Sequence, residues 1–299
     1  MSADRPIALI TRIWPTQDRP SVGTFVRERA MGVPGLRVVR PRVPTLLIYP
    51  QLLAEALRLG PIRGVEAHML IPTGLVGLLV ARRRRVPLVV YSHGGDVRDW
   101  RRLPGSLRWL ARQVARRADR LLTNSEETAI DLRELGGHPE VVPPGADLTR
   151  FVPSPRPAER RVLYLGGQNE RKGYEVARGL AHTLVGPWLH DVDPADIPAL
   201  IAAHDVVLVP SVAEPFGLVA VEAIASGRWV VASDVGGLRD IVRDGVNGTL
   251  VSDGDFAGAL ERVPDYDPFA IAPTIERYSL AAWQAAMARV WDEVAPTDG

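Results

Sequence analysis

Short apolar runs alternate along this chain with longer stretches in which apolar residues fit one face of a helix. The short runs predict β-strands and the longer periodic stretches predict helices. The predicted strands lie at 7–13, 36–39, 65–70, 87–91, 120–123, 140–142, 161–165, 205–209, 229–232 and 248–251. The predicted helices lie at 24–31, 51–59, 74–84, 105–118, 125–135, 173–184, 196–203, 216–226, 237–243 and 279–294. Because the strands are nearly continuous apolar runs that alternate with helices, the pattern predicts α/β domains with parallel sheets covered on both faces.

A proline-rich stretch at 152–157 has the composition of a linker. It predicts two α/β domains, at 1–154 and 155–278, followed by a last segment at 279–299 that holds the final helix. A length of 299 residues suits two domains of ordinary size. The content of 46% hydrophobic and 24% charged residues excludes a disordered or fibrous protein.

The two halves differ in charge, although the net charge of the chain is only +1. Residues 1–150 carry 24 basic and 14 acidic side chains, whereas residues 151–299 carry 12 and 21. Every basic residue is arginine except Lys172. The absence of cysteine excludes disulfides, thiolate zinc sites and a cysteine nucleophile, and it fits a reducing compartment.

The apolar stretch at the N-terminus is typical of a first strand and not of a signal peptide, because it is short, carries Arg12 and lacks a cleavage pattern. The longest mostly apolar run, 71–81, is far shorter than the roughly 20 residues that span a bilayer. We therefore expect a soluble, cytoplasmic protein that can at most attach peripherally to the inner face of a membrane.

Loops after parallel strands are candidate sites, because ligands of open α/β sheets bind beyond the carboxyl ends of the strands. The loop after 161–165 begins with Gly166 and Gly167 and ends with Arg171, Lys172 and Gly173. Such a turn lets backbone amides approach a phosphate, and the basic residues add charge. The alternative is that these glycines only allow the tight turn after the strand and bind no ligand.

The loop after 205–209 leads into a helix and reads Glu214-Pro215-Phe216-Gly217-Leu218. Pro215 suits a helix N-terminus, and Gly217 leaves the first amides of the helix open to an anion. Glu222 then lies in an otherwise apolar helix, where a carboxylate needs hydrogen-bonding partners. A vicinal diol such as a ribose would supply them; a surface position for Glu222 is the alternative.

Two further loops have similar features. Gly236 and Gly237 precede another helix after 229–232. Three glycine-containing turns of this kind in one domain are stronger evidence for a phosphate ligand than any one of them alone. In the first half, the strand at 87–91 is followed by His93, two glycines and Asp96. A lone histidine is more often structural, but a histidine in such a loop at the carboxyl end of a strand is a candidate functional residue.

Together these motifs resemble glycosyltransferase family 4, of GT-B fold, over nearly the whole chain. The most specific part is Glu214-Pro215-Phe216-Gly217 with Glu222 eight residues after Glu214. The other matching segments are 22–28, His93 to Asp96, 141–147, Lys172-Gly173 and 227–251.

The resemblance implies two Rossmann-like domains that face each other across a cleft, with the last helix crossing back to the first domain. It also implies retaining, hexosyltransferase-type transfer of a sugar from a nucleotide-diphosphate sugar to a hydroxyl acceptor, which would be lipid-linked, a glycan or a small molecule. By position, His93, Lys172 and Glu214 are expected to be catalytic, and Asp96 to lie on the acceptor side. The expected donor-binding residues are Gly23, Gly166, Gly167, Arg171, Phe216, Gly217, Leu218 and Glu222.

The sequence departs from the family pattern in four places. Gly167 stands where an arginine is usual, with Arg171 as the candidate substitute; Gly23-Thr24 replaces a glycine pair, and Pro144 replaces an asparagine. Only 32 residues separate Lys172 from Asp205, which predicts a reduced C-terminal sheet.

The expected chemistry needs no cofactor or metal, with the nucleotide sugar as co-substrate. Lys172 and helix-start amides would stabilise the charge on the departing diphosphate. Because Glu214 has no evident acid partner for a two-carboxylate mechanism, the resemblance favours front-face attack in which the departing phosphate takes the proton. Three Asp-x-Asp patterns, 191–193, 253–255 and 265–267, follow no convincing strand and are expected by chance.

The basic first half contains arginine clusters at 82–85 and 98–120, the second interleaved with Trp100 and Trp109. A basic amphipathic helix with tryptophan is typical of membrane-surface binding, and a solvated arginine-rich face is the alternative. Nucleic acid is not an expected partner, since no recognised binding motif accompanies the charge. Two other functions stay open: a sugar-nucleotide epimerase of the same fold, and a non-catalytic nucleotide-sugar or membrane-binding module.

Overall fold

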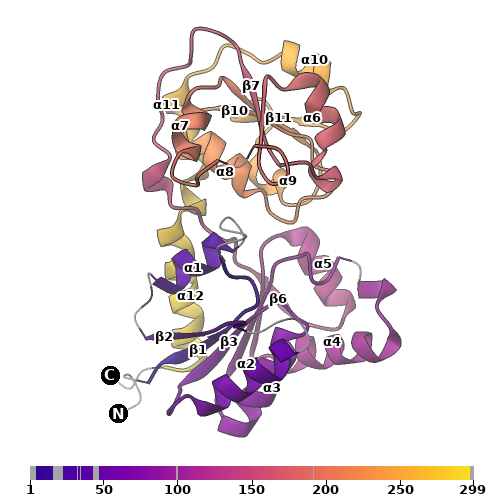
Figure 1. Ribbon diagram of the computed structural model, residues 1–299, viewed down its shortest axis with the longest axis vertical. Helices are drawn as coiled ribbons and strands as arrows, with labels where there is room; N and C mark the ends of the chain where they lie inside the picture. The colour runs from indigo at the N-terminus through magenta and orange to yellow at the C-terminus, as the bar shows by residue number, and fades with distance from the viewer. Residues whose placement is uncertain are drawn as a thin grey trace. The chain divides into compact units, whose positions relative to one another are not determined.

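The computed structural model describes residues 5–15, 23–31, 33, 35–42, 47–98, 100–190 and 192–296. The chain forms two compact units (Figure 1), the first made of Met1–Pro143 and Trp283–Gly299 and the second of Pro144–Ala282. The proline-rich stretch 152–157 therefore belongs to the second unit. Helix α12 (Leu280–Val294) begins in the second unit and continues into the first from Trp283 onward.

The first unit contains a six-stranded parallel sheet in the order β2-β1-β3-β4-β5-β6. Its strands are β1 (Ile7–Ile10), β2 (Leu36–Val39), β3 (Gly64–His68), β4 (Leu88–Ser92), β5 (Arg120–Thr123) and β6 (Pro139–Val141). Its helices, besides the greater part of α12, are α1 (Thr24–Met31), α2 (Ile48–Arg58), α3 (Thr73–Arg84), α4 (Gly105–Arg117) and α5 (Glu126–Glu134), with a short 3-10 turn, η2, at Trp100–Arg102. Helix α3 packs on β3, where Gly77 lets the backbones approach, since a Cβ there would lie 3.0 Å from Ala67.

The second unit contains a five-stranded parallel sheet in the order β11-β10-β9-β7-β8. Its strands are β7 (Val162–Leu165), β8 (Thr183–Val185), β9 (Val206–Val209), β10 (Trp229–Ser233) and β11 (Gly248–Val251). Its helices are α6 (Tyr174–Leu180), α7 (Ile197–Ala202), α8 (Leu218–Ala225), α9 (Leu238–Ile241), α10 (Phe256–Glu261) and α11 (Pro268–Ile271), with 3-10 turns η3 (Leu148–Arg150), η4 (Glu170–Lys172) and η5 (Ala272–Tyr278).

Alternate residues of the second sheet enter two separate cores. Leu163, Val207 and Val230 pack in one cluster, whereas Val162, Val206 and Val231 pack in another. Because successive side chains of a strand point to opposite faces, strands that are apolar throughout bury both faces of the sheet. The prediction of two α/β domains with parallel sheets is confirmed.

Several elements differ from the predicted ones. The helix expected at 173–184 ends at Leu180, and Thr183–Val185 forms β8, paired with β7. The apolar residues of this stretch belong first to a helix and then to a strand. Interpreting the whole stretch as one helix, with a single helical period, was therefore wrong. Two short helices, α10 and α11, were not predicted; each begins at an aspartate whose side chain accepts a backbone amide proton, from Gly258 to Asp255 and from Phe269 to Asp267.

Those caps give two of the Asp-x-Asp patterns a structural explanation, since aspartate is a preferred residue at helix N-termini. In the third pattern, Asp193 accepts from the backbone amide of Ala195, and Asp191 lies outside the described residues. Within the described part of the chain, no group of three or more histidine, aspartate or glutamate residues could hold a metal ion. None of the helices described there is long and apolar enough to cross a membrane.

Candidate functional site

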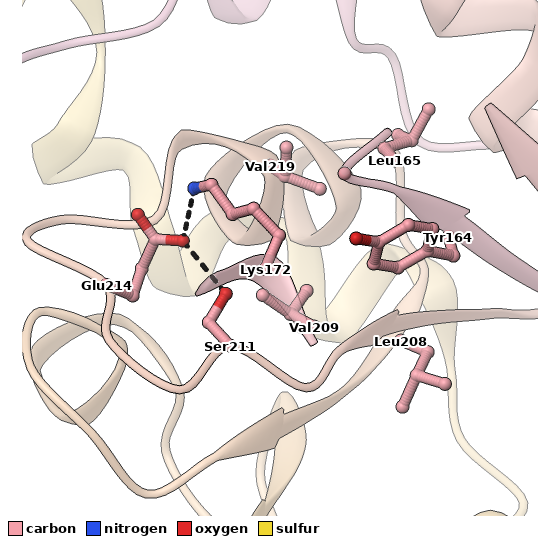
Figure 2. A pocket seen from close by; sticks show the side chains of 9 residues that line it. Tyr164, Leu165, Lys172, Leu208, Val209, Ser211, Glu214 and Val219 are labelled. Atoms are coloured by element: carbon pink, nitrogen blue, oxygen red, sulfur yellow. Dashed lines mark hydrogen bonds and ion pairs between the residues drawn. The ribbon is translucent and has the colours of Figure 1, made fainter. Parts of the chain in front are cut away.

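A pocket lies at the carboxyl ends of β7 and β9 in the second unit (Figure 2). Its lining consists of Tyr164, Leu165, Gly166, Lys172, Leu208, Val209, Ser211, Glu214 and Val219. Apolar strand residues form one part of it, and three polar side chains meet at the other. This is the edge of the sheet at which open α/β folds bind ligands.

The polar part of the pocket is an ion pair supported by a hydroxyl group. Lys172 Nζ donates to Glu214 Oε2 over 2.6 Å, and Ser211 Oγ donates to the same oxygen over 3.1 Å (Figure 2). The Glu214 side chain is 8% exposed and that of Lys172 is 39% exposed. The lysine therefore keeps access to solvent while a nearly buried carboxylate orients its ammonium group.

The local sequence fixes the backbone of Lys172. The side chain of Asn169 accepts from the amide of Arg171 over 2.9 Å and starts the 3-10 turn η4. Gly173 ends this turn in the left-handed region, with φ at 75°. A Cβ on Gly173 would lie 1.9 Å from the carbonyl oxygen of Pro210, so only glycine fits there.

We expect Gly173→Ala to destabilise the second unit by at least about 1–2 kcal/mol, because it adds left-handed strain to a clash with backbone. Gly179 is the matched control, since it lies in α6 with open space around it. Gly179→Ala should stabilise by about 0.5–1 kcal/mol. Thermal unfolding of the two variants measures the contrast, and equal effects would contradict the conformational argument.

The two glycines before Lys172 are both confined by neighbouring groups. A Cβ on Gly166 would lie 2.2 Å from the hydroxyl of Tyr164, and one on Gly167 would lie 2.4 Å from the carbonyl oxygen of Pro187. Gly167 also has φ at 65°, and its carbonyl accepts from Tyr164 Oη over 3.0 Å. The structure therefore requires glycine at 167, the position at which the resemblance noted above implies an arginine. Arg171 is exposed and does not line the pocket.

The loop that carries Glu214 continues into α8 through Gly217, with φ at 115°. Gly217 lies next to Glu214, because a Cβ on it would be 3.7 Å from Glu214 Cγ. Leu218, the first residue of α8, is half-buried, and the first amides of a helix have no partner within the helix. The start of α8 therefore stands beside the ion pair.

Phe216 and Gly237 lie in close contact beside this loop, and the donor-binding roles expected of Phe216 and Glu222 stay predictions. The Phe216 ring is buried and packs edge-on against Tyr278, with centroids 5.6 Å apart. Gly237 is needed for close approach, since a Cβ there would lie 2.5 Å from the carbonyl oxygen of Phe216. Glu222 is half-buried between buried neighbours on α8 and is not part of the pocket lining.

In the first unit, His93 follows β4 and is held through its backbone. Its amide donates to Asp96 Oδ1 over 3.1 Å, and its carbonyl accepts from Asn124 Nδ2 over 3.0 Å. Asp96 also accepts from Ser92 Oγ and from the amide of Leu70. Burial raises the pKa of Asp96 above its ordinary value, and these hydrogen bonds offset only part of that rise. The carboxylate thus organises the loop around His93, and the acceptor-side role given to it stays a prediction.

Gly23 lies at the start of α1, with φ at 77° and no room for a Cβ against Ile13. Most of the loop before it, residues 16–22, lies outside the described residues. The expected lining of a cleft by Gly23 therefore stays a prediction.

Sequence reasoning missed Ser211 and Tyr164 at the pocket, and a buried polar cluster behind His93. In that cluster Glu66 Oε1 accepts from His68 Nε2 over 3.0 Å, and its carboxylate pairs with Arg29. Glu66 and His68 stand two residues apart in an apolar strand, so they point to the same face. Two polar residues at that spacing were the signal that could have revealed them, since buried charges need partners.

Two family models match this chain in succession. "Glycosyl transferase 4-like domain" matches residues 7–145, and "Glycosyl transferases group 1" matches residues 148–264. Together they span most of both units.

Curated relatives are named D-inositol 3-phosphate glycosyltransferase. The protein from Rhodococcus erythropolis is 31% identical over an alignment of 330 positions, which covers 85% of this chain and 73% of the relative. The one from Nocardia farcinica is 34% identical over 255 positions, covering 63% of this chain and 56% of the relative. The chain thus matches little more than half the length of several of these relatives.

Solved structures share the fold of this chain. HepE from Anabaena, in complex with UDP and glucose, superposes with a TM-score of 0.74 at 19% identity and covers 96% of this chain and 99% of its own. Sucrose-phosphate synthase from Thermosynechococcus elongatus gives a TM-score of 0.76 at 20% identity, covering 97% and 98%. With the family models and the Rhodococcus relative, the chain belongs to glycosyltransferase family 4, with the two sheets of the GT-B fold.

Proposed function

We propose that this protein is a retaining, hexosyltransferase-type glycosyltransferase that moves a sugar from a nucleotide-diphosphate sugar to an acceptor hydroxyl. The observation that carries the proposal is the Lys172–Glu214 ion pair at the carboxyl edge of the second sheet, beside the start of α8. Exposed lysine and helix-start amides suit a diphosphate. The HepE structure, which holds UDP and glucose, supports a UDP-sugar as the first donor to try.

In the proposed reaction, the bond between the anomeric carbon and the diphosphate oxygen breaks, and a bond to the acceptor oxygen forms on the same face of the sugar. Lys172 stabilises the charge that builds on the departing diphosphate. Glu214 is the one carboxylate among the described residues that line the pocket. A double displacement needs two carboxylates about 5–5.5 Å apart, so we favour front-face attack, with the acceptor proton passing to the departing phosphate. The proposal assigns no step to a metal or cofactor.

A panel assay tests this function against its alternatives. The protein is incubated with UDP-, GDP- and ADP-sugars, each with and without an acceptor panel that includes D-inositol 3-phosphate, after the relatives' names. Acceptor-dependent nucleotide release with a retained anomeric configuration supports transfer. A changed donor sugar without acceptor would show an epimerase, and saturable donor binding with neither product would show a binding module.

We assign the ribose hydroxyls of the donor to Glu222, on α8. A charge-assisted hydrogen bond contributes about 1.5–3 kcal/mol, so Glu222→Ala should weaken donor binding by about 10- to 150-fold. Isothermal titration with the donor found in the panel assay measures the change. Glu261→Ala, exposed on α10 of the same unit, is the control and should bind like the wild type. Unchanged affinity of the Glu222 variant would overturn this role.

We also propose that α4 attaches the protein peripherally to the anionic inner face of a membrane, which suits a cytoplasmic location and a lipid-linked acceptor. Trp109 is 59% exposed, and the exposed Arg112 and Arg116 follow at helical spacing on the same face. Ala111 and Val114 are buried on the opposite face. An exposed basic face with tryptophan is typical of interfacial helices.

We expect salt-sensitive co-sedimentation with phosphatidylglycerol vesicles and little with phosphatidylcholine vesicles. Each basic residue near an anionic surface contributes about 1 kcal/mol, so replacing Arg112 and Arg116 by glutamine should weaken binding by about 10- to 30-fold. The matched control replaces Arg161 and Arg243, exposed on the second unit. Equal loss in both variants, or no binding by the wild type, would contradict the membrane proposal and favour the alternative of a solvated arginine-rich face.

A further inference from the structure

A turn at the carboxyl end of β8 holds a tryptophan in a backbone conformation that tryptophan rarely adopts. The amide of Leu189 donates to the carbonyl oxygen of Gly186 over 3.1 Å, which closes a turn with Pro187 and Trp188 in the middle. Trp188 has φ at 63°. Proline at the second position and a positive φ at the third are typical of a type II turn, whose third position favours glycine or asparagine. The sequence therefore places tryptophan where the turn itself disfavours it.

Trp188 also exposes most of its surface to water. It is 79% exposed, although a large aromatic side chain stabilises a fold chiefly when it is buried. Both its backbone conformation and its exposure are thus unfavourable for the stability of the second unit. Departures of this kind from local sequence rules gather at functional sites, so Trp188 is a candidate binding residue.

The turn that carries Trp188 lies against the glycine loop of the pocket. The amide of Gln168 donates to the carbonyl oxygen of Pro187 over 2.9 Å. A Cβ on Gly167 would lie 2.4 Å from the same oxygen. These contacts join the turn to the loop whose preceding residue, Gly166, lines the pocket. Trp188 is therefore a neighbour of the pocket, although it does not line it.

The order of the strands shows how one ligand could reach both places. Lys172 follows β7 and Glu214 follows β9, whereas β8 pairs with β7 on the side away from β9. Neighbouring strands lie about 4.8 Å apart, so the ends of β9 and β8 are separated by about 10 Å. A nucleoside diphosphate can span that distance. With its diphosphate at Lys172, its base would lie toward the end of β8.

We propose that Trp188 stacks on the base of the donor nucleotide, and that this contact explains its place in the turn. Every base has a π-face, so stacking suits uracil, guanine and adenine alike. Trp188 thus adds affinity for the nucleoside without selecting its base. That the ligand is a nucleotide sugar rests on the proposed function.

A membrane is the other partner that exposed tryptophan suits. The charge of this half of the chain disfavours it, because residues 151–299 carry 12 basic and 21 acidic side chains. Basic residues, not acidic ones, attract a protein to an anionic bilayer. We therefore favour the nucleotide base, and vesicle binding becomes an outcome of the test.

Binding of nucleoside diphosphates to the whole protein tests the stacking without any sugar transfer. UDP, GDP and ADP are titrated by calorimetry, with inorganic pyrophosphate as the ligand that has no base. Trp188→Asn should weaken binding of the preferred nucleoside diphosphate by about 5- to 150-fold, the range of one base–aromatic stack. It should leave the affinity for pyrophosphate unchanged. Trp188→Phe should recover most of the loss, because it restores an aromatic ring.

Two controls separate stacking from damage to the fold. Asparagine tolerates the left-handed region, so Trp188→Asn should unfold at a temperature no lower than that of the wild type. Phe269→Asn removes another exposed ring from the same unit, 54% exposed on α11, and should bind nucleotide like the wild type.

The outcomes distinguish this proposal from the proposed function. Equal nucleotide affinity of the wild type and Trp188→Asn would overturn the stacking and leave the transferase function intact. An equal loss of pyrophosphate binding would also overturn it, and so would a loss of phosphatidylglycerol vesicle binding in place of nucleotide binding. If no nucleoside diphosphate binds the wild type, the nucleotide-sugar function and the stacking both fail. If nucleotide binding depends on Trp188 but the panel assay yields no transfer, the transferase assignment fails and the stacking stands.

Discussion

Replacing Lys172 by methionine should lower kcat for sugar transfer by about 100- to 1000-fold, the usual effect of removing one preorganised group that stabilises developing charge. Lys172 is the one lysine of the chain, and its Nζ lies 2.6 Å from Glu214 Oε2 at the edge of the pocket. Methionine keeps most of the apolar stem but cannot offset the charge of a departing diphosphate. Nucleotide release with the best donor and acceptor measures the effect.

The control for Lys172 is Arg178→Met, which removes a positive charge from the exposed face of α6 and should leave kcat unchanged. Lys172→Met also leaves Glu214 nearly buried with only Ser211 as its described partner, so each variant needs an unfolding curve. If transfer by folded Lys172→Met falls less than tenfold, the lysine is not the group that stabilises the leaving diphosphate.

Replacing Glu66 by alanine should destabilise the first unit by about 3–5 kcal/mol, because Arg29 then keeps a buried charge without its partner. The comparison variant is Glu293→Ala, whose carboxylate pairs with Arg120 at the surface and is 60% exposed. Exposed pairs contribute about 0–1 kcal/mol. Urea unfolding followed by signals from the first unit separates the two. A small loss for Glu66→Ala would mean that Arg29 finds other acceptors.

The same pair makes stability depend on pH in the acid range. The pKa of Glu66 is about 2 in the folded protein, below its ordinary value of 4.5. The unfolded chain therefore binds a proton first as the pH falls, so the stabilising effect is complete above about pH 4.5 and is lost progressively toward pH 2. Unfolding curves at several pH values in this window measure it, and the slope should be smaller in the Glu66→Gln variant.

The periodic pattern was sufficient for most strands and helices and for the parallel sheets. It failed where one stretch changes period, as at Leu180 to Val185, and where a short helix is set by a single capping aspartate. The loops at Lys172 and Glu214 could be found because neighbours in sequence build them: Asn169, Gly173 and Gly217 fix the local backbone.

The buried cluster behind His93 could not be assembled from the sequence in the same way. Arg29 and Glu66 are 37 residues apart, and Trp291, which donates to Glu66 Oε2 over 2.9 Å, is 225 residues away. Which partner neutralises a charge in a strand depends on tertiary packing. The spacing of Glu66 and His68 in an apolar strand could have signalled that they need partners, but not which residues those are.

Trp291 has a consequence for the order in which the protein folds during synthesis. Its ring fills the space over Gly64, where a Cβ would lie 2.3 Å from it, and its indole nitrogen completes the bonds to Glu66. All of the second unit is therefore made before the first can close its core, although domains usually fold in the order in which they leave the ribosome. Until α12 emerges from the ribosome, the first sheet has a tryptophan-sized gap, and the Glu66 carboxylate lacks one hydrogen-bond donor. During that time the nascent chain is exposed to proteolysis and aggregation.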